Sequence, residues 1–426
     1  MTSILSYLAV LVLKKKSNHE TQILKMKTKL ITLLFVFTVI NIFGQAAVQS
    51  KSGKTNYSNN KALTDIDMVT HKAIKPLKKV PLDKESILIY DYDGSLMSFN
   101  LEKEAFNWTV KATDLTIEMC ANQVTLLDGV IYIPFVNGEI FAIDSQTGSI
   151  FWKSRLGNIT DQIVLKNQVP IINDGKLFIT TQSPNNNIYA LDIKDGSLIW
   201  NYKLDNLYND NPVLFFDNKV FVQSGSNFYS FEANTGKLLN QKGFEEAMTG
   251  KPITDGENVF IANEKNVVFA LSPDKLDVLW QFKIDENQND IKDRIFCKDK
   301  KVYFAAQGPE GSSIYAVDSK TGTQIWKTDF KDNNVEYMVE ESDNIWGYTR
   351  KGKLFQIDIM NGEIAFEVKL ITKPISNLEF AEDDFLYYYS DAALIQFEFK
   401  TKDENEIYLR TSIKDDAYSA YLKLIR

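Results

Sequence analysis

A motif that returns at a regular interval constrains the fold of this chain more than any other feature of its sequence. The stretch "IFAIDSQTGSIFW" places an Asp two residues after an Ala, a Gly four residues after that Asp, and a Trp four residues after the Gly. Two further stretches, "YALDIKDGSLIW" and "YAVDSKTGTQIW", keep the same spacing. The three copies consist of Ala142, Asp144, Gly148 and Trp152; Ala190, Asp192, Gly196 and Trp200; and Ala316, Asp318, Gly322 and Trp326. Regular recurrence of this kind indicates a repeat architecture.

Weaker copies extend the pattern over most of the chain. Two of them end at Trp108 and Trp280, and three others carry Asn240, Phe366 and Ile407 at the tryptophan position, so that the eight markers lie 40 to 48 residues apart. Each interval contains four short strand-like runs and no amphipathic helix. Four-stranded units at this spacing are typical of propeller blades. We therefore expect an all-β, eight-bladed β-propeller of four-stranded antiparallel blades, with seven blades as the alternative because the eighth copy is poor.

Each residue type in the motif has a physical reason. Ala142 is small enough to let a large side chain lie across its strand, and Gly148 can adopt the positive φ of a tight turn. Trp152 brings a wide apolar ring to a fixed place in the blade, and burying such a ring is worth roughly 3–5 kcal/mol. Asp144 stands just before the turn, where its carboxylate can accept backbone N–H groups, which favours a structural role over a ligand role.

The repeated Ala-x-Asp-x-x-Thr-Gly-x-x-x-Trp pattern resembles the tryptophan-docking motif of the PQQ-like β-propeller repeat family. The resemblance covers residues 78 to 410, and the second copy departs from it by carrying Asp195 in place of Thr. Members of the family include quinoprotein dehydrogenases and BamB, a propeller lipoprotein of the outer-membrane barrel-assembly machinery. The resemblance implies eight blades around a central channel. It is compatible with either an enzyme or a binding protein.

The cofactor motifs of the family enzymes are missing from the sequence. Family quinoproteins use a vicinal cysteine pair beside the quinone, whereas this chain has only Cys120 and Cys297, which are expected on opposite sides of the ring and too far apart for a disulfide. The stretch "DENQNDIKDRIF" begins like a calcium loop but has Asp290 where Gly is needed and Phe296 where Glu is needed. We therefore expect no cofactor, neither PQQ nor calcium, and no catalytic or metal-binding residues.

The two ends of the chain are predicted to lie outside the blades or to close them. Residues 1–45 comprise an upstream extension and a signal peptide starting at Met26, with a short membrane anchor as the alternative; residues 46–79 form a polar arm and residues 80–426 the propeller. No cysteine follows the apolar run to serve as a site for lipid attachment. The tail "DAYSAYLKLIR" is strand-like, and we expect it to pair with a terminal blade.

Charge and composition exclude further classes of function. Beyond residue 45 the chain has 42 basic and 55 acidic residues, a net charge of −13, which argues against binding nucleic acid. The same part has one histidine, His71, which argues against a histidine-rich metal site or a Ser-His-Asp triad. We expect an exported, periplasmic or extracellular, non-catalytic propeller that binds another envelope or extracellular protein as a scaffold, without a stable membrane span in the mature chain. The alternatives are an enzyme with an unrecognised site on a propeller face and a degenerate PQQ- and calcium-dependent dehydrogenase.

Overall fold

The computed structural model describes residues 86–91, 94–112, 122–158, 160–182, 186–204, 212–284, 291, 295–331, 333–381, 384–390, 393–409 and 420–425. All the regular elements within these ranges are β-strands, 32 in number. In this part of the chain no helix is long and apolar enough to cross a membrane. The predicted signal peptide and polar arm lie outside the described residues, as do Cys120 and most of the calcium-like loop.

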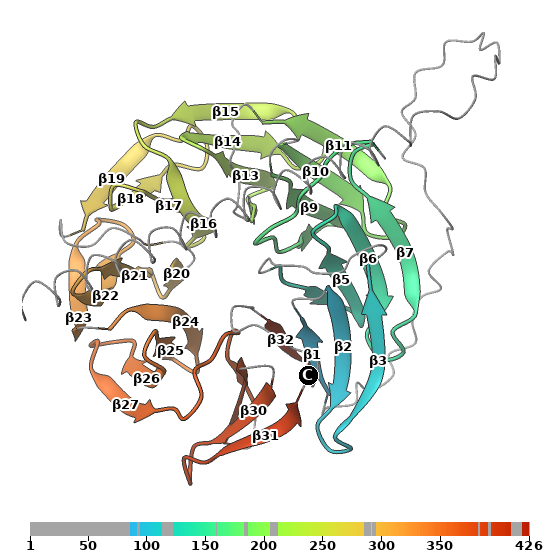
Figure 1. Cartoon of the computed structure of the whole chain (residues 1–426). Coiled ribbons are helices and arrows are strands. Elements are labelled where there is room, and N and C mark those ends of the chain that lie inside the picture. The colour runs from blue at the N-terminus through green and yellow to red at the C-terminus, as the bar shows by residue number, and fades with distance from the viewer. Residues whose placement is uncertain are drawn as a thin grey trace, which may run out of the picture. The chain divides into compact units, whose positions relative to one another are not determined.

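The strands form eight four-stranded antiparallel sheets arranged in a ring (Figure 1). Blade 1 contains β32 (Tyr421–Ile425), β1 (Ser86–Tyr90), β2 (Ser95–Asn100) and β3 (Ala105–Lys111), and blade 2 contains β4 (Thr125–Leu127), β5 (Val130–Pro134), β6 (Glu139–Asp144) and β7 (Ile150–Arg155). Blade 3 contains β8 (Ile171–Asn173), β9 (Lys176–Thr180), β10 (Asn187–Asp192) and β11 (Leu198–Lys203), and blade 4 contains β12 (Leu214–Phe216), β13 (Lys219–Ser224), β14 (Asn227–Glu232) and β15 (Leu238–Gly243). Blade 5 contains β16 (Met248–Thr254), β17 (Val259–Asn263), β18 (Val267–Leu271) and β19 (Val278–Lys283), and blade 6 contains β20 (Ile295–Lys298), β21 (Lys301–Gly308), β22 (Gly311–Asp318) and β23 (Gln324–Lys331). Blade 7 contains β24 (Val335–Glu341), β25 (Asn344–Thr349), β26 (Lys353–Asp358) and β27 (Ile364–Lys369), and blade 8 contains β28 (Glu379–Phe380), β29 (Phe385–Ser390), β30 (Ala393–Glu398) and β31 (Glu404–Leu409).

The predicted eight-bladed propeller is confirmed, and the alternative of seven blades is wrong. The poor eighth copy of the motif still forms a complete sheet, with β31 as its fourth strand. In every blade the first strand lies nearest the centre of the ring and the fourth lies at the outer rim (Figure 1). The marker residues therefore stand on the outermost strands.

The ring is closed by the C-terminal strand. β32 occupies the innermost position of blade 1 and pairs antiparallel with β1, from Ser86 opposite Ile425 to Tyr90 opposite Tyr421. Figure 1 shows the red C-terminal strand beside the blue first strand. Pairing of the tail with a terminal blade is thus confirmed for residues 421–425.

A β-bulge interrupts the pairing of the third and fourth strands in all eight blades. In blade 2, Ala142 lies opposite Trp152 and Ile143 lies opposite Ile150, so Phe151 has no partner in the register. A bulge of this kind re-aims the side chain that follows it. In blade 8 the bulge lies further along the strand and leaves out Ile407 itself, so the choice of Ile407 as the tryptophan equivalent was wrong.

The hydrophobic core lies between neighbouring blades. One cluster joins Ile140 and Trp152 of blade 2 to Leu177 and Tyr189 of blade 3, and similar clusters fill the other junctions. The second strands are buried along most of their length, and every residue of β5 is buried. Continuous apolar runs are expected where a sheet is covered on both faces.

Candidate functional site

Each marker tryptophan is docked on the following blade. The indole Nε1 of Trp152 donates to the backbone carbonyl of Ile193, at 2.9 Å, in the turn between the third and fourth strands of blade 3. The corresponding bonds are Trp108 to Ser145 (3.2 Å), Trp200 to Ala233 (2.9 Å), Trp280 to Ser319 (2.9 Å) and Trp326 to Ile359 (3.2 Å). Five of the eight seams between blades are therefore held by the same contact.

The motif glycine serves the tryptophan of the preceding blade as well as its own turn. Gly196 has φ +73°, and a Cβ built on it would lie 2.5 Å from Cε3 of Trp152. Gly148 stands in the same relation to Trp108, at 2.7 Å. The need for a turn could be predicted from one copy of the motif, whereas this contact could not, because the two residues belong to different copies.

In the degenerate copies of the motif, the glycine and the tryptophan of the preceding blade are lost together. The glycine position of blade 5 is Leu276, with φ 59°, and the preceding marker is Asn240, whose amide donates to the carbonyl of Asp274 at 2.7 Å. The glycine position of blade 8 is Lys402, whose Nζ lies 5.5 Å from the ring centroid of Phe366, the preceding marker. A glycine is therefore needed only where a tryptophan covers the turn.

Aromatic residues of the second strand pack against the marker residue in five blades. The rings of Tyr132 and Trp152 lie 6.0 Å apart on either side of Ala142, which is their common cross-strand neighbour. In blade 7 the marker is the smaller Phe366, and the second-strand position holds Trp346, with 5.8 Å between the ring centroids. This explains the sixth tryptophan of the chain, which does not occupy a marker position.

The motif aspartates are engaged within their own turns. Oδ1 of Asp318 accepts the backbone N–H groups of Lys320 (3.1 Å) and Thr321 (2.8 Å) and the hydroxyl of Thr321 (2.9 Å). These bonds, led by that from the Thr321 backbone, hold the pKa of Asp318 below its usual value. Asp144, Asp192 and Asp358 accept backbone N–H groups of their own turns in the same way. These carboxylates therefore have hydrogen-bond partners within their own turns.

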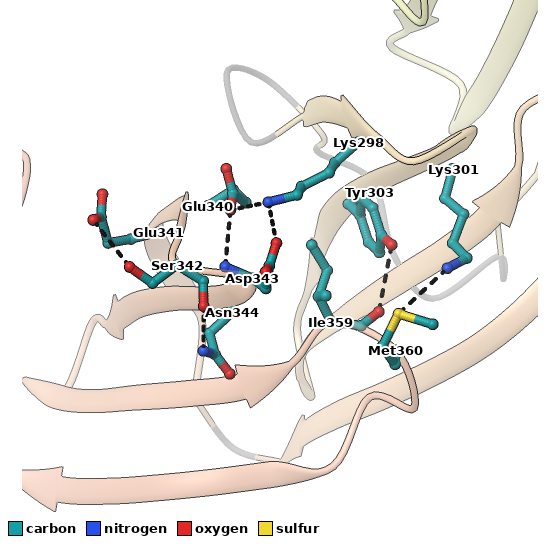
Figure 2. Close-up of polar contacts among 10 residues, drawn as sticks. All are labelled: Lys298, Lys301, Tyr303, Glu340, Glu341, Ser342, Asp343, Asn344, Ile359 and Met360. Carbon is teal, nitrogen blue, oxygen red and sulfur yellow. Dashed lines mark hydrogen bonds and ion pairs between the residues drawn. The ribbon is translucent and has the colours of Figure 1, made fainter.

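Polar contacts between turns tie blade 6 to blade 7 (Figure 2). Nζ of Lys298, at the end of β20, lies 2.5 Å from Oδ1 of Asp343 and 2.6 Å from Oε1 of Glu340. Hydrogen bonds to Asp343 and then Glu340 raise the pKa of Lys298, so the lysine stays charged. Nearby, Lys301 meets the sulfur of Met360 at 3.8 Å. Sequence reasoning missed this cluster, although opposite charges at equivalent turns of neighbouring repeats could have indicated it.

The described residues include Cys297 but no cluster of three possible metal ligands of the types His, Cys, Asp and Glu. Cys297 packs against the core between blades 5 and 6, and burial raises the pKa of its thiol. The position of Cys120 lies outside the described residues, so the expected separation of the two cysteines stays a prediction.

The bulges present apolar side chains to solvent on four consecutive blades. The residues without a cross-strand partner in blades 3 to 6 are Ile199, Leu239, Leu279 and Ile325, and they are 40, 40, 51 and 44% exposed. The same position holds the polar Asn107 in blade 1 and the small Ala365 in blade 7, so the fold does not require a large apolar residue there. We call these four residues the rim arc. They recur at one structural position on neighbouring blades, which makes them a candidate surface for a protein partner.

Comparison with known proteins identifies the family. A family model described as "Outer membrane protein assembly factor BamB" matches residues 46–282 and 310–405. A curated relative of that name from Moranella endobia (strain PCIT) is 26% identical over 146 residues, which are 34% of this chain and 35% of the relative, so the match spans about a third of that relative's length.

Solved structures share the fold. BamB from Moraxella catarrhalis superposes with a TM-score of 0.58 and 16% identity, covering 77% of this chain and 98% of that one. A quinohemoprotein alcohol dehydrogenase from Comamonas testosteroni superposes with a TM-score of 0.57 and 11% identity, covering 74% and 68%. At these identities the superpositions show the propeller fold alone, whereas the family model covers well over half of the chain. The docked tryptophans, the eight closed blades and this match together show that the chain belongs to the family of the outer membrane protein assembly factor BamB.

Proposed function

We propose that this chain is a non-catalytic scaffold of the cell envelope that binds other proteins of outer membrane assembly. The observation that carries the proposal is the match of the BamB family model over most of the propeller. The apolar run that follows Met26 supports export, because it has the length and flanking lysines of a signal peptide.

The geometry of the repeats supports binding over catalysis. The recurring motif residues are used to build the ring: tryptophans of five blades dock on the turn of the next blade, and the aspartates bond to their own turns. What varies from blade to blade is the set of loops and rim residues around a rigid ring. A ring of this size can supply the roughly 800 Å² per partner that a specific interface needs.

The rim arc is the surface that we assign to the partner. Its four aliphatic side chains lie on β11, β15, β19 and β23, which follow one another around the outer rim (Figure 1). Removing exposed apolar side chains from water favours association with a partner. A photo-reactive residue placed at position 279 in the full-length chain should therefore form crosslinks to outer membrane assembly proteins in intact cells.

A matched control uses Ile371, which is 84% exposed and lies beyond the end of β27. A photo-reactive residue at position 371 should give few of these crosslinks, and Leu239→Ser with Ile325→Ser should weaken those at position 279. Equal crosslinking at positions 279 and 371 would contradict the proposal that the rim arc binds the partner. Absence of assembly proteins from all crosslinks would remove the scaffold function itself.

The dehydrogenase alternative predicts a different outcome. The purified chain is titrated with PQQ and with calcium, and absorbance and melting temperature are followed together. A scaffold should show neither a quinone spectral shift nor a large calcium-dependent rise in melting temperature at micromolar ligand. Either change would favour the cofactor-dependent enzyme.

A further inference from the structure

The innermost strand of blade 1 comes from the far end of the propeller sequence, unlike the innermost strands of the other blades. In blades 2 to 8 the first strand is followed in sequence by the second strand, to which it pairs. In blade 1 the first strand is β32, whose partner β1 lies at the opposite end of the propeller sequence. The structure thus contains a position for one strand that is occupied by a separate segment, which we call the strand slot.

The strand slot holds β32 along both of its edges. One edge forms the five-residue ladder with β1. On the other edge, the Asn377 side chain accepts the N–H of Leu422 at 2.8 Å and donates to the carbonyl of Leu422 at 2.9 Å. Oε2 of Glu379 accepts the N–H of Leu424 at 2.9 Å. Two side chains therefore recognise the backbone that a neighbouring strand would otherwise pair with.

The strand slot also selects side chains. Leu422 and Leu424 are 0 and 6% exposed and pack in the cluster between blades 8 and 1, whereas Ile425 is 3% exposed and packs in the cluster between blades 1 and 2. Lys423 points the other way from the leucines and lies 3.7 Å from Oε1 of Glu379. The ligand that fits is an extended segment with apolar residues at alternate positions and a cation between them.

We propose that the strand slot is a strand-binding site that also accepts β32 from a second copy of this chain, so that two copies can close each other's ring. A second copy carries the one strand whose fit to the slot the structure establishes, and exchange of identical elements is a low-cost route to dimers. Eleven residues, 410–420, connect β31 to β32 and can reach at most about 40 Å. The proposal does not depend on the scaffold function.

The concentration at which exchange occurs follows from the connection. A short tether gives its own strand an effective concentration in the millimolar range. Binding within one chain should therefore dominate at micromolar protein, and exchange should appear in millimolar protein or when the resident strand is weakened.

The first test weakens the resident strand in the full-length chain. In Leu422→Ser with Leu424→Ser, a labelled peptide of residues 419–426 should bind at least tenfold more tightly than it binds the native chain. The same peptide carrying both serines should bind at least tenfold more weakly, and adding Asn377→Ala should reduce peptide affinity about tenfold. Circular dichroism establishes that the variant is folded, and Leu424→Ala replaces it if it is not. Equal binding to native and variant chains, or equal binding of the two peptides, would overturn the strand-binding site.

The second test uses the second copy itself. Cys120→Ser and Cys297→Ser remove the native thiols, and Leu88→Cys with Lys423→Cys places a pair opposite one another in the β1–β32 register. Oxidation should give linkage within one chain at micromolar protein and disulfide-linked dimers after warming and cooling at millimolar protein. The matched control, Leu88→Cys with Ser98→Cys, joins β1 to β2 and should stay monomeric under both conditions. Absence of dimers from the first pair, or equal amounts from both pairs, would overturn exchange between copies.

Discussion

The coupling between a tryptophan and the glycine of the next blade can be measured by replacing Gly196 with alanine. An alanine at φ +73° costs roughly 1–2 kcal/mol for the left-handed backbone alone. Its Cβ would also lie 2.5 Å from the Trp152 ring, which must shift, and overpacking of this kind costs about 1–3 kcal/mol more. We expect Gly196→Ala to lower the free energy of unfolding by about 2–5 kcal/mol.

Gly175 provides the matched control. It has φ +71° but no atom within 4 Å of a built Cβ, so Gly175→Ala carries the backbone cost without the overlap. Trp152→Ala, which removes a side chain only 2% exposed, should cost about 3–5 kcal/mol. In the Trp152→Ala background the overlap is gone, and Gly196→Ala should then cost about as much as Gly175→Ala.

Guanidinium denaturation followed by far-UV circular dichroism measures these differences, since the loss of a tryptophan would disturb a fluorescence signal. The denaturant slope should stay constant, so that shifts of the midpoint report stability. The double-mutant cycle should give a coupling of about 1–3 kcal/mol between positions 152 and 196. Equal costs for the two glycine replacements in the native background would refute the docking explanation, as would a difference that persists without the tryptophan.

Three further outcomes are expected. Asn377→Ala removes both bonds to the Leu422 backbone and should lower the free energy of unfolding by about 1–3 kcal/mol in the same denaturation assay, whereas a loss below 0.5 kcal/mol, on the order of a surface substitution, would contradict the edge contact. Lys300→Gly relieves a φ of 59° in a two-residue hairpin turn and removes an exposed ion pair with Glu257. We expect the melting temperature to rise, because the strain costs more than an exposed ion pair contributes. A lower melting temperature would contradict this ranking. Asp318→Ala should lower the melting temperature at pH 7. The folded-state pKa of Asp318 lies below its ordinary 3.8, so the difference in melting temperature between the variant and the native chain should be full above pH 3.8 and disappear as the pH falls through the folded-state pKa. A difference that does not change with pH would contradict the role of the carboxylate.

The repeat made the fold predictable, because the spacing of the motif specifies both the four-stranded unit and the number of units. The position of the tryptophan could be predicted, but its partner could not. The contact between Trp152 and Gly196 joins two copies of the motif, and a single copy contains no trace of the geometry that brings them together. In blade 8 the bulge lies at a different place in the fourth strand, so the spacing of the motif no longer predicts which residues pair across the strands. For this reason Ile407 was the wrong marker.

The candidate site was less predictable than the fold. The rim arc depends on which residue the bulge leaves unpaired, and that follows from the pairing of strands and not from the alternation of apolar residues. Leu279 and Ile325 stand beside a tryptophan in a strand-like run and would be assigned to the core by pattern alone, yet they are half exposed. The edge contacts of Asn377 were hidden for a different reason, since they reach residues 45 positions away.

The closing strand has a consequence for the order in which the molecule can be completed during synthesis. Ser86 and Ile425 pair although more than 300 residues separate them, whereas strands within a blade are joined by hairpins. Loop closure over that distance costs roughly 3 kcal/mol more than over about ten residues, from about 0.6 kcal/mol per doubling of length. Blade 1, which emerges first from the ribosome, must therefore wait for the last strand, and the chain remains an open arc until then. The proposed export is compatible with this order, because translocation can proceed while no ring exists to obstruct it.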